Sequence, residues 1–161
     1  MFKVPGQSVT GINQFWFNIG LAAFGTSHFI GTGYIISGNY YVSTGLISAR
    51  WACVEDNFVK PAVPQTELRI DKLNELGLYY GKIFKTNLIY VSGSLGISYT
   101  WGKKCQFLNR YDYNYPGIPV NFHLYFIPVP VFGIGIEWNS NINVKQTTHE
   151  VFICLQIGLL K

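Results

Sequence analysis

The C-terminal segment, residues 149–161, alternates strictly between aliphatic and mixed side chains, and this limits the folds open to the chain. One face of the segment is wholly aliphatic and consists of Val151, Ile153, Leu155, Ile157 and Leu159. The other face carries Glu150, Phe152, Cys154, Gln156 and Gly158. A period of two residues predicts a β-strand whose two faces meet different surroundings.

Seven other segments show the same period, and no segment shows a helical one. We expect strands at residues 13–24, 27–37, 40–53, 67–81, 88–101, 117–129, 132–140 and 149–161. Short turns are expected at residues 38–40, 82–87 and 128–131, and longer loops at 54–66, 102–116 and 141–148. Strands joined by short connections are antiparallel, and short turns at one end with long loops at the other are typical of outer-membrane barrels.

The sequence therefore predicts an all-β fold, an eight-stranded antiparallel up-and-down transmembrane β-barrel. We expect one barrel domain over residues 13–161 and an N-terminal periplasmic segment over residues 1–12. The first residues hold one lysine but no apolar stretch typical of a signal peptide. Either the chain is a cytosolic protein or it is a mature form whose signal has been removed, and the composition favours the second interpretation.

The composition favours a membrane barrel over a water-soluble protein. Hydrophobic residues make up 48% of the 161 residues and charged residues only 12%, whereas soluble domains carry about 25% charged residues. No Asp, Glu, Lys or Arg occurs from Val4 to Ala49, yet Gly, Asn, Ser and Thr interrupt this stretch, so it is no transmembrane helix. The net charge of +4 is spread out, which argues against nucleic-acid binding.

The aliphatic face of the strands is expected to face lipid. If it faced inward, a nearly uncharged surface of Gly, Ser and Thr would face water, unlike soluble sheets. Aromatic side chains at strand ends, such as Tyr99, Trp101 and Trp138, suit an interfacial girdle. The expected lipid-facing residues are Phe15, Phe17, Ile19, Leu21, Ile89, Val91, Leu95, Ile97, Val120, Phe122, Leu124, Ile134, Ile136, Val151, Ile153, Leu155, Ile157 and Leu159. A soluble, lipocalin-like ligand-binding barrel is the less favoured alternative.

The opposite face carries the ionisable groups of the strands. We expect a polar network inside the barrel made of Arg50, Glu75, Tyr79, Asn121, His123, Tyr125, Glu137 and Glu150. Charges in so narrow an interior need partners, and small barrels fill their interior with side chains rather than leaving a channel. The network is therefore interpreted as structural.

The alternative function is a lipid-modifying hydrolase, in which His123 acts as base and Glu137 orients it beside a serine nucleophile. Lipid A deacylases are eight-stranded outer-membrane barrels with a His-x-Ser pair on the membrane-facing surface. Here His123 lies in the inward register and Tyr125 occupies the serine position. The sequence therefore predicts no catalytic activity, and it indicates no cofactor or metal site.

Three long stretches of the chain resemble a family of small outer-membrane β-barrel proteins from Bacteroidota. They are "FWFNIGLAAFG", "ELGLYYGKIFKTNLIYVSGSLGISY" and "PGIPVNFHLYFIPVPVFGIGIEWNSNINVKQTTHEVFICLQIGLLK". The similarity covers most of residues 13–161, rests on short glycine-based motifs, and is most specific in the last third. It implies an outer-membrane location and a barrel fold, and it implies no activity. Many such barrels end on an aromatic residue, whereas this chain ends Leu160-Lys161.

A tyrosine-rich segment, residues 103–117, is the candidate partner-binding loop, with Arg110, Tyr111, Tyr113 and Tyr115 as its candidate contacts. Packing over the barrel mouth is the equal alternative. We expect the partners to be outer-membrane lipid or lipopolysaccharide and other outer-membrane proteins. The most concrete functional hypothesis is an accessory or structural subunit of an outer-membrane complex. Cys53 and Cys105 flank long loops on one side, and a disulfide between them stays open.

Overall fold

The computed structural model describes residues 14–26, 29–42, 44–55, 69–106, 109–143 and 147–158. Within these ranges, the side chains of residues 22–26, 29–30, 69–71, 105–106 and 109–110 are not described. The expected N-terminal segment, residues 1–12, and the expected lipid-facing Leu159 lie outside the described residues.

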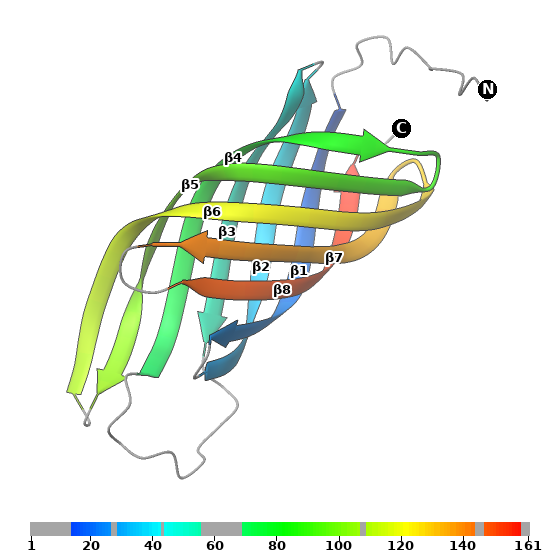
Figure 1. Ribbon diagram of the computed structural model, residues 1–161. Coiled ribbons are helices and arrows are strands. Elements are labelled where there is room, and N and C mark those ends of the chain that lie inside the picture. Colours follow the sequence, from blue (N-terminus) through cyan, green and yellow to red (C-terminus); the bar gives the residue numbers. More distant parts are fainter. Residues whose placement is uncertain are drawn as a thin grey trace, which may run out of the picture.

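Eight antiparallel strands form a closed barrel in which each strand pairs with its neighbour in the chain and β1 pairs with β8 (Figure 1). The strands are β1 (Gln14–Thr26), β2 (Phe29–Val42), β3 (Gly45–Glu55), β4 (Arg69–Lys85), β5 (Ile89–Gln106), β6 (Asn109–Val129), β7 (Phe132–Ile142) and β8 (Thr148–Gly158). The predicted all-β fold, an eight-stranded antiparallel barrel, is confirmed. Among the described residues, no helix has the length and hydropathy needed to cross a membrane.

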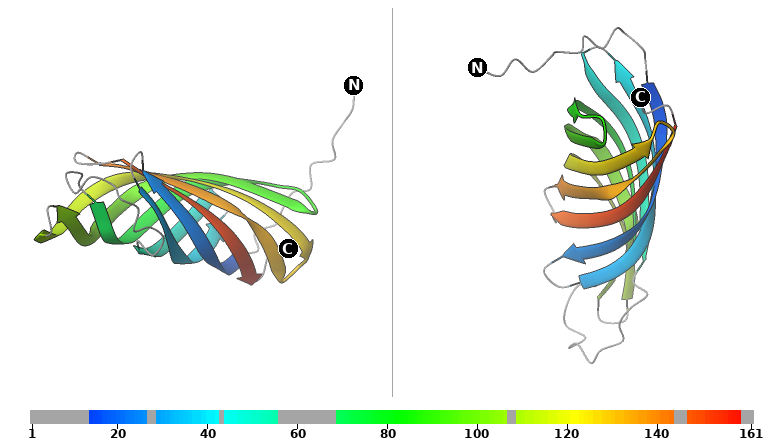
Figure 2. Two further views of the ribbon diagram at one scale, coloured as in Figure 1. Left: turned by 90° about the horizontal axis from the view of Figure 1, so that it is seen from below. Right: turned by 90° about the vertical axis from the view of Figure 1, so that its right-hand side faces the viewer.

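The two ends of the barrel differ in their connections. We call the end with the connections 43–44, 86–88 and 130–131 the turn end, and the opposite end, which carries the other connections, the loop end. Trp16 of β1 pairs with Gly158 of β8, so the barrel starts and finishes at the turn end. The strands cross the barrel at a steep tilt (Figures 1 and 2), as closure of eight strands requires.

Three expected connections are wrong. The turn at 38–40 lies inside β2, because Ser37 and Asn39 continue the inward alternation and the strand runs on to Val42. The turn at 82–87 begins only after Lys85. In the expected loop 103–117, residues 103–106 and 109–117 are instead paired strand, because β5 continues to Gln106 and β6 begins at Asn109. This long hairpin extends past its neighbours at the loop end (lower left of Figure 1).

Side chains alternate between a filled interior and an exposed outer wall. In β8, Phe152, Cys154 and Gln156 are fully buried, whereas Ile153 between them is 65% exposed. Inward glycines make room for large inward rings: a Cβ atom on Gly135 would come within 2.7 Å of the Tyr125 ring. The interior is therefore packed, as expected for eight strands.

Candidate functional site

Arg50 is the centre of the barrel interior. It points inward from the middle of β3, is 1% exposed, and forms ion pairs with three carboxylates. Its Nη1 lies 2.7 Å from Oε1 of Glu75 on β4, its Nε lies 3.1 Å from Oε1 of Glu137 on β7, and its Nη2 contacts Oε2 of Glu150 on β8. The guanidinium also lies over the Phe152 ring, 4.9 Å from its centroid. Arg50 thus links four strands from both sides of the barrel.

Amide and hydroxyl side chains donate further hydrogen bonds to these carboxylates. Asn121 donates to Glu137 over 2.9 Å, and Tyr79 donates to Glu75 over 3.1 Å. Asn139 donates to both Glu75 and Glu150, each over 3.3 Å. Hydrogen bonds of this kind are needed to offset the loss of hydration when charges are buried.

Acidic groups outnumber basic ones in this network. Three carboxylates face the single guanidinium of Arg50, and the His123 imidazole lies 3.4 Å from Glu137. The amides of Asn121, Asn139 and Asn141 also donate to the carboxylates and help to stabilise their negative charge. Among the described residues, no group of His, Cys, Asp and Glu side chains is arranged to hold a metal ion.

The structure places every expected network residue in the interior, and it adds others. Tyr125 packs in a buried apolar cluster of the barrel interior, where its ring is stacked on that of Tyr90 with centroids 5.5 Å apart. Asn141, which falls in an expected loop, is the penultimate residue of β7 and donates to Glu75, Ser98 and Thr100. The polar residues that sequence reasoning omitted are Ser98, Thr100, Asn139 and Asn141. Their inward register is the signal that could have identified them.

His123 is placed where a membrane-facing hydrolase could not use it. Its imidazole is inside the barrel and 2% exposed. Its Nδ1 lies 3.1 Å from the Tyr90 hydroxyl, and that hydroxyl in turn lies 3.1 Å from Oγ of Ser92. Tyr90 thus stands between the imidazole and the nearest serine on the neighbouring strand. A Ser–His pair for acyl transfer requires direct hydrogen-bond contact, and this group does not provide it.

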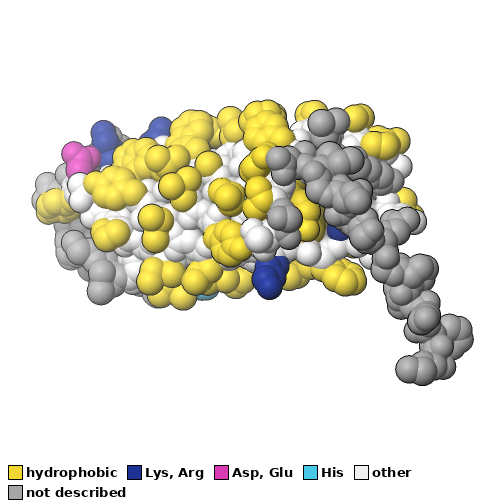
Figure 3. Space-filling model, turned by 90° about the horizontal axis from the view of Figure 1, so that it is seen from above, with side chains coloured by type: hydrophobic (Ala, Val, Ile, Leu, Met, Phe, Trp, Pro, Cys, Tyr) yellow, Lys and Arg dark blue, Asp and Glu magenta, His cyan; other side chains and the backbone are white. Residues whose placement is uncertain are grey.

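The outer wall is apolar over its whole described circumference. All expected lipid-facing residues except the undescribed Leu159 point outward, with Val91 and Val120 half-buried and the others exposed. Further outward side chains, such as Leu76, Leu78 and Phe84, extend the same surface. Figure 3 shows hydrophobic side chains along the length of the barrel, with acidic side chains at one end and Lys or Arg side chains both at that end and in the opposite half. An exposed apolar surface this large marks contact with lipid or protein rather than water.

Charged side chains form a row across β3 to β6 at the loop end of this wall. Glu55 pairs with Lys72, Lys72 with Lys103, and Lys103 with Asp112 in successive strands. The Lys72 ammonium lies 2.5 Å from the Glu55 carboxylate. The row limits the apolar part of the wall on that side.

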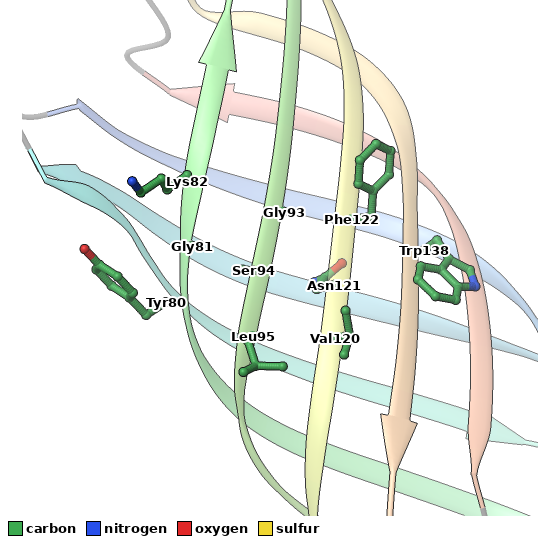
Figure 4. Close-up of a pocket in the computed structure, with 10 residues that line it drawn as sticks. All are labelled: Tyr80, Gly81, Lys82, Gly93, Ser94, Leu95, Val120, Asn121, Phe122 and Trp138. Carbon is green, nitrogen blue, oxygen red and sulfur yellow. The ribbon is translucent and has the colours of Figure 1, made fainter.

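A shallow groove of about 510 Å³ opens in the wall over β4 to β7 (Figure 4). Gly93 forms its floor, and Lys82, Leu95, Phe122 and Trp138 line its sides. We call it the Gly93 groove. In this groove, the charged side chain of Lys82 lies beside an open apolar surface near the turn end.

The expected partner-binding residues lie in the β5–β6 hairpin rather than in a loop. Tyr113 and Tyr115 are on its inner face, stacked with centroids 5.4 Å apart, and Nζ of Lys104 lies 4.7 Å from the Tyr113 ring centroid. Tyr115 is 3% exposed, whereas Tyr111 is 52% exposed. Of these tyrosines, Tyr111 is therefore the most accessible to a partner. The Arg110 side chain is not described.

Cys53 is a buried free thiol. The side chain of Cys105, its candidate disulfide partner, lies outside those described.

Comparison with known proteins shows which known fold the chain shares. No family model matches the chain, and no curated protein matches it in sequence. Solved structures do match. The fold is that of small outer-membrane β-barrels. The N-terminal barrel domain of Pseudomonas aeruginosa OprF is 9% identical, with a TM-score of 0.71 over 92% of this chain and 99% of the domain. The attachment invasion locus protein Ail of Yersinia pestis is 14% identical, with a TM-score of 0.62 over 91% of this chain and 97% of Ail.

Neisserial surface protein A is a third similar structure, at 13% identity and a TM-score of 0.62, over 92% of this chain and 97% of that protein. Ail has also been solved in a phospholipid bilayer nanodisc and with the heparin analogue sucrose octasulfate. At these identities the likeness concerns the fold, and it carries no residue of any site into this chain.

Proposed function

We propose that this protein is an integral outer-membrane β-barrel of the small Bacteroidota family that it resembles, and that it acts as a non-catalytic accessory or structural subunit of an outer-membrane complex. The observation that carries the proposal is that polar and charged side chains lie inside the barrel wall, whereas apolar side chains lie outside it. Arg50, Glu75, Glu137 and Glu150 are buried inside, while exposed aliphatic and aromatic side chains cover the outside. A soluble barrel has the opposite arrangement, whereas apolar-out and polar-in is the pattern of membrane barrels.

The interior supports a structural role rather than transport. Arg50 and its carboxylates cross the middle of the barrel, and Tyr125 and Phe152 pack in the apolar cluster beside them. Eight strands leave no room for water once such side chains fill the interior. The surfaces available for function are thus the outer wall and the projecting β5–β6 hairpin.

The membrane location is tested with tryptophan fluorescence. Two variants keep a single tryptophan, either Trp138, 39% exposed on the outer wall, or Trp16, 2% exposed inside. In vesicles with brominated acyl chains, we expect quenching of Trp138 and little quenching of Trp16, because bromine quenches on contact. Folded protein that needs no detergent, with Trp138 in contact with water, contradicts the proposal and favours the lipocalin-like alternative.

The accessory role is tested by purification from native membranes in a mild detergent. We expect a second outer-membrane protein to co-purify in fixed stoichiometry and to be lost with Tyr111→Ala at the hairpin. Tyr99→Ala, which removes an exposed tyrosine from the apolar wall, is the matched control. A homogeneous monomer with no co-purifying chain would remove the accessory role and leave the barrel itself in place.

A further inference from the structure

Lys82 occupies an unusual position on the outer wall. The other outward charges whose side chains are described, Glu55, Lys72, Lys103 and Asp112, form the row at the loop end. Lys82 instead points outward near the turn end of β4, just before the 86–88 connection. It is exposed, and it makes no ion pair or hydrogen bond with any residue that the structure describes. The Lys82 ammonium is therefore available to a partner from outside the chain.

The Gly93 groove begins directly beside Lys82. Gly93 pairs with Lys82 on one side and with Phe122 on the other, so that Lys82 and Phe122 are two strand spacings apart, roughly 10 Å. A Cβ atom added to Gly93 would meet nothing within 4 Å. Figure 4 shows the side chains of Tyr80 and Lys82 on one side of this gap and those of Phe122 and Trp138 on the other.

One end of the groove is polar and the rest is apolar. The Tyr80 hydroxyl donates to the backbone oxygen of Thr44 in the β2–β3 connection over 3.1 Å, which fixes Tyr80 close to the turn end. From there the groove continues along the wall past Leu95 and Val120. A lysine at such a place extends its ammonium toward the interface while its methylenes stay in apolar surroundings.

We propose that the Gly93 groove binds one phospholipid with an anionic headgroup, its phosphate beside the Lys82 ammonium and an acyl chain over Gly93. This inference rests on the proposed membrane location, which makes the turn end the periplasmic one. The Lys82 ammonium favours an anionic headgroup over a zwitterionic one. A second copy of the chain docked here about a two-fold axis would bring two Lys82 side chains together, and their repulsion disfavours it.

The test is native mass spectrometry of the purified barrel in a non-ionic detergent, with phosphatidylglycerol and phosphatidylcholine of identical acyl chains added in equal amounts. Lys82→Gln is expected to lower bound phosphatidylglycerol about five-fold, the effect of one lysine at an anionic surface, and to leave phosphatidylcholine unchanged. Gly93→Leu, which fills the gap without a clash, is expected to lower binding of both lipids.

Two control variants match these changes elsewhere on the wall. Lys103→Gln removes an outward charge at the loop end, and Gly38→Leu adds a side chain at an outward glycine of β2 whose nearest neighbour would be the Phe17 ring at 3.7 Å. Both should bind the two lipids as wild type does.

Three results would overturn the proposal: equal retention of both lipids by wild type, an unchanged lipid preference in Lys82→Gln, or a wild-type dimer that Gly93→Leu dissociates. The last would assign the groove to a second copy. Heat-modifiable migration of each variant reports folding separately. A folded, membrane-embedded barrel that shows no lipid preference therefore refutes phospholipid binding in the Gly93 groove and leaves the proposed function intact.

Discussion

Replacing Arg50 with glutamine should destabilise the barrel far more than replacing any one of the acids that surround it. Removing Arg50 leaves Glu75, Glu137 and Glu150 buried without a cation. Loss of one partner from a buried ion pair costs about 3–5 kcal/mol. Because Arg50 is shared by three carboxylates, we expect a loss at the upper end of this range, about 4–5 kcal/mol.

Glu150→Gln tests the same reasoning in the opposite direction. Arg50 keeps Glu75 and Glu137 as partners, and the change removes one of the excess negative charges of the interior. The new amide can still accept a hydrogen bond from Arg50. We therefore expect a change in the free energy of unfolding within about 1 kcal/mol, close to the net worth of an ordinary hydrogen bond.

Urea unfolding of the barrel in lipid vesicles, followed by heat-modifiable migration, measures both changes. Combining Arg50→Gln with glutamine at Glu75, Glu137 and Glu150 should recover much of the lost stability, because no unpaired charge then remains. Equal effects of Arg50→Gln and Glu150→Gln, or no recovery in the combined variant, would refute the view that charge pairing holds this interior together.

Three further changes test the outer wall, the packing and the absence of catalysis. Ile153 lies in mid-strand and is 65% exposed, so Ile153→Arg should lower the free energy of unfolding in vesicles by about 2–4 kcal/mol. Ile142→Arg, at the loop end, should lower it by only about 0–1 kcal/mol. Equal losses in urea unfolding would argue against lipid around β7 and β8. A Cβ atom at Gly96 would lie 2.1 Å from the Leu78 carbonyl oxygen, whereas one at Gly93 would meet nothing within 4 Å. We therefore expect Gly96→Ala to destabilise the barrel by about 1–3 kcal/mol and Gly93→Ala by under about 0.5 kcal/mol. Equal unfolding midpoints for the two alanine variants would show that the wall at β4–β5 is looser than described. His123→Ala should leave the acyl composition of the membrane lipids as in wild type, measured by mass spectrometry of extracted lipid; a shift would reopen the hydrolase.

The number of strands, and which of their side chains point inward, could be predicted because both follow from a period of two residues. Once Val151, Ile153 and Leu155 share a face, Phe152 and Cys154 must share the other, and barrel closure extends this to every strand. Connections were harder to place. Gly38 and Asn39 have the composition of a hairpin turn, but the inward position of Asn39 beside Ser48, which donates to it over 2.7 Å, keeps them in β2.

The segment 103–117 is difficult to predict for a similar reason. Its polarity suggests a loop, yet Tyr111, Tyr113 and Tyr115 alternate with Asp112 and Asn114 as a strand requires. The sequence could place Arg50, Glu137 and Glu150 on the same side of the wall, but not bring them together. Their contacts depend on the relative heights of β3, β7 and β8, which are set by the tilt and stagger of the closed barrel.

The sharing of Arg50 among distant strands has a consequence for how the barrel assembles. Glu137 and Glu150 follow Arg50 by 87 and 100 residues and reach it only across the finished barrel. A sheet that had entered the membrane before closing would expose the guanidinium and the carboxylates to hydrocarbon, where unpaired charges are strongly disfavoured. In the proposed membrane location we therefore expect insertion and closure to be coupled, because the last strand both seals the β1–β8 seam and completes the charge balance of the interior.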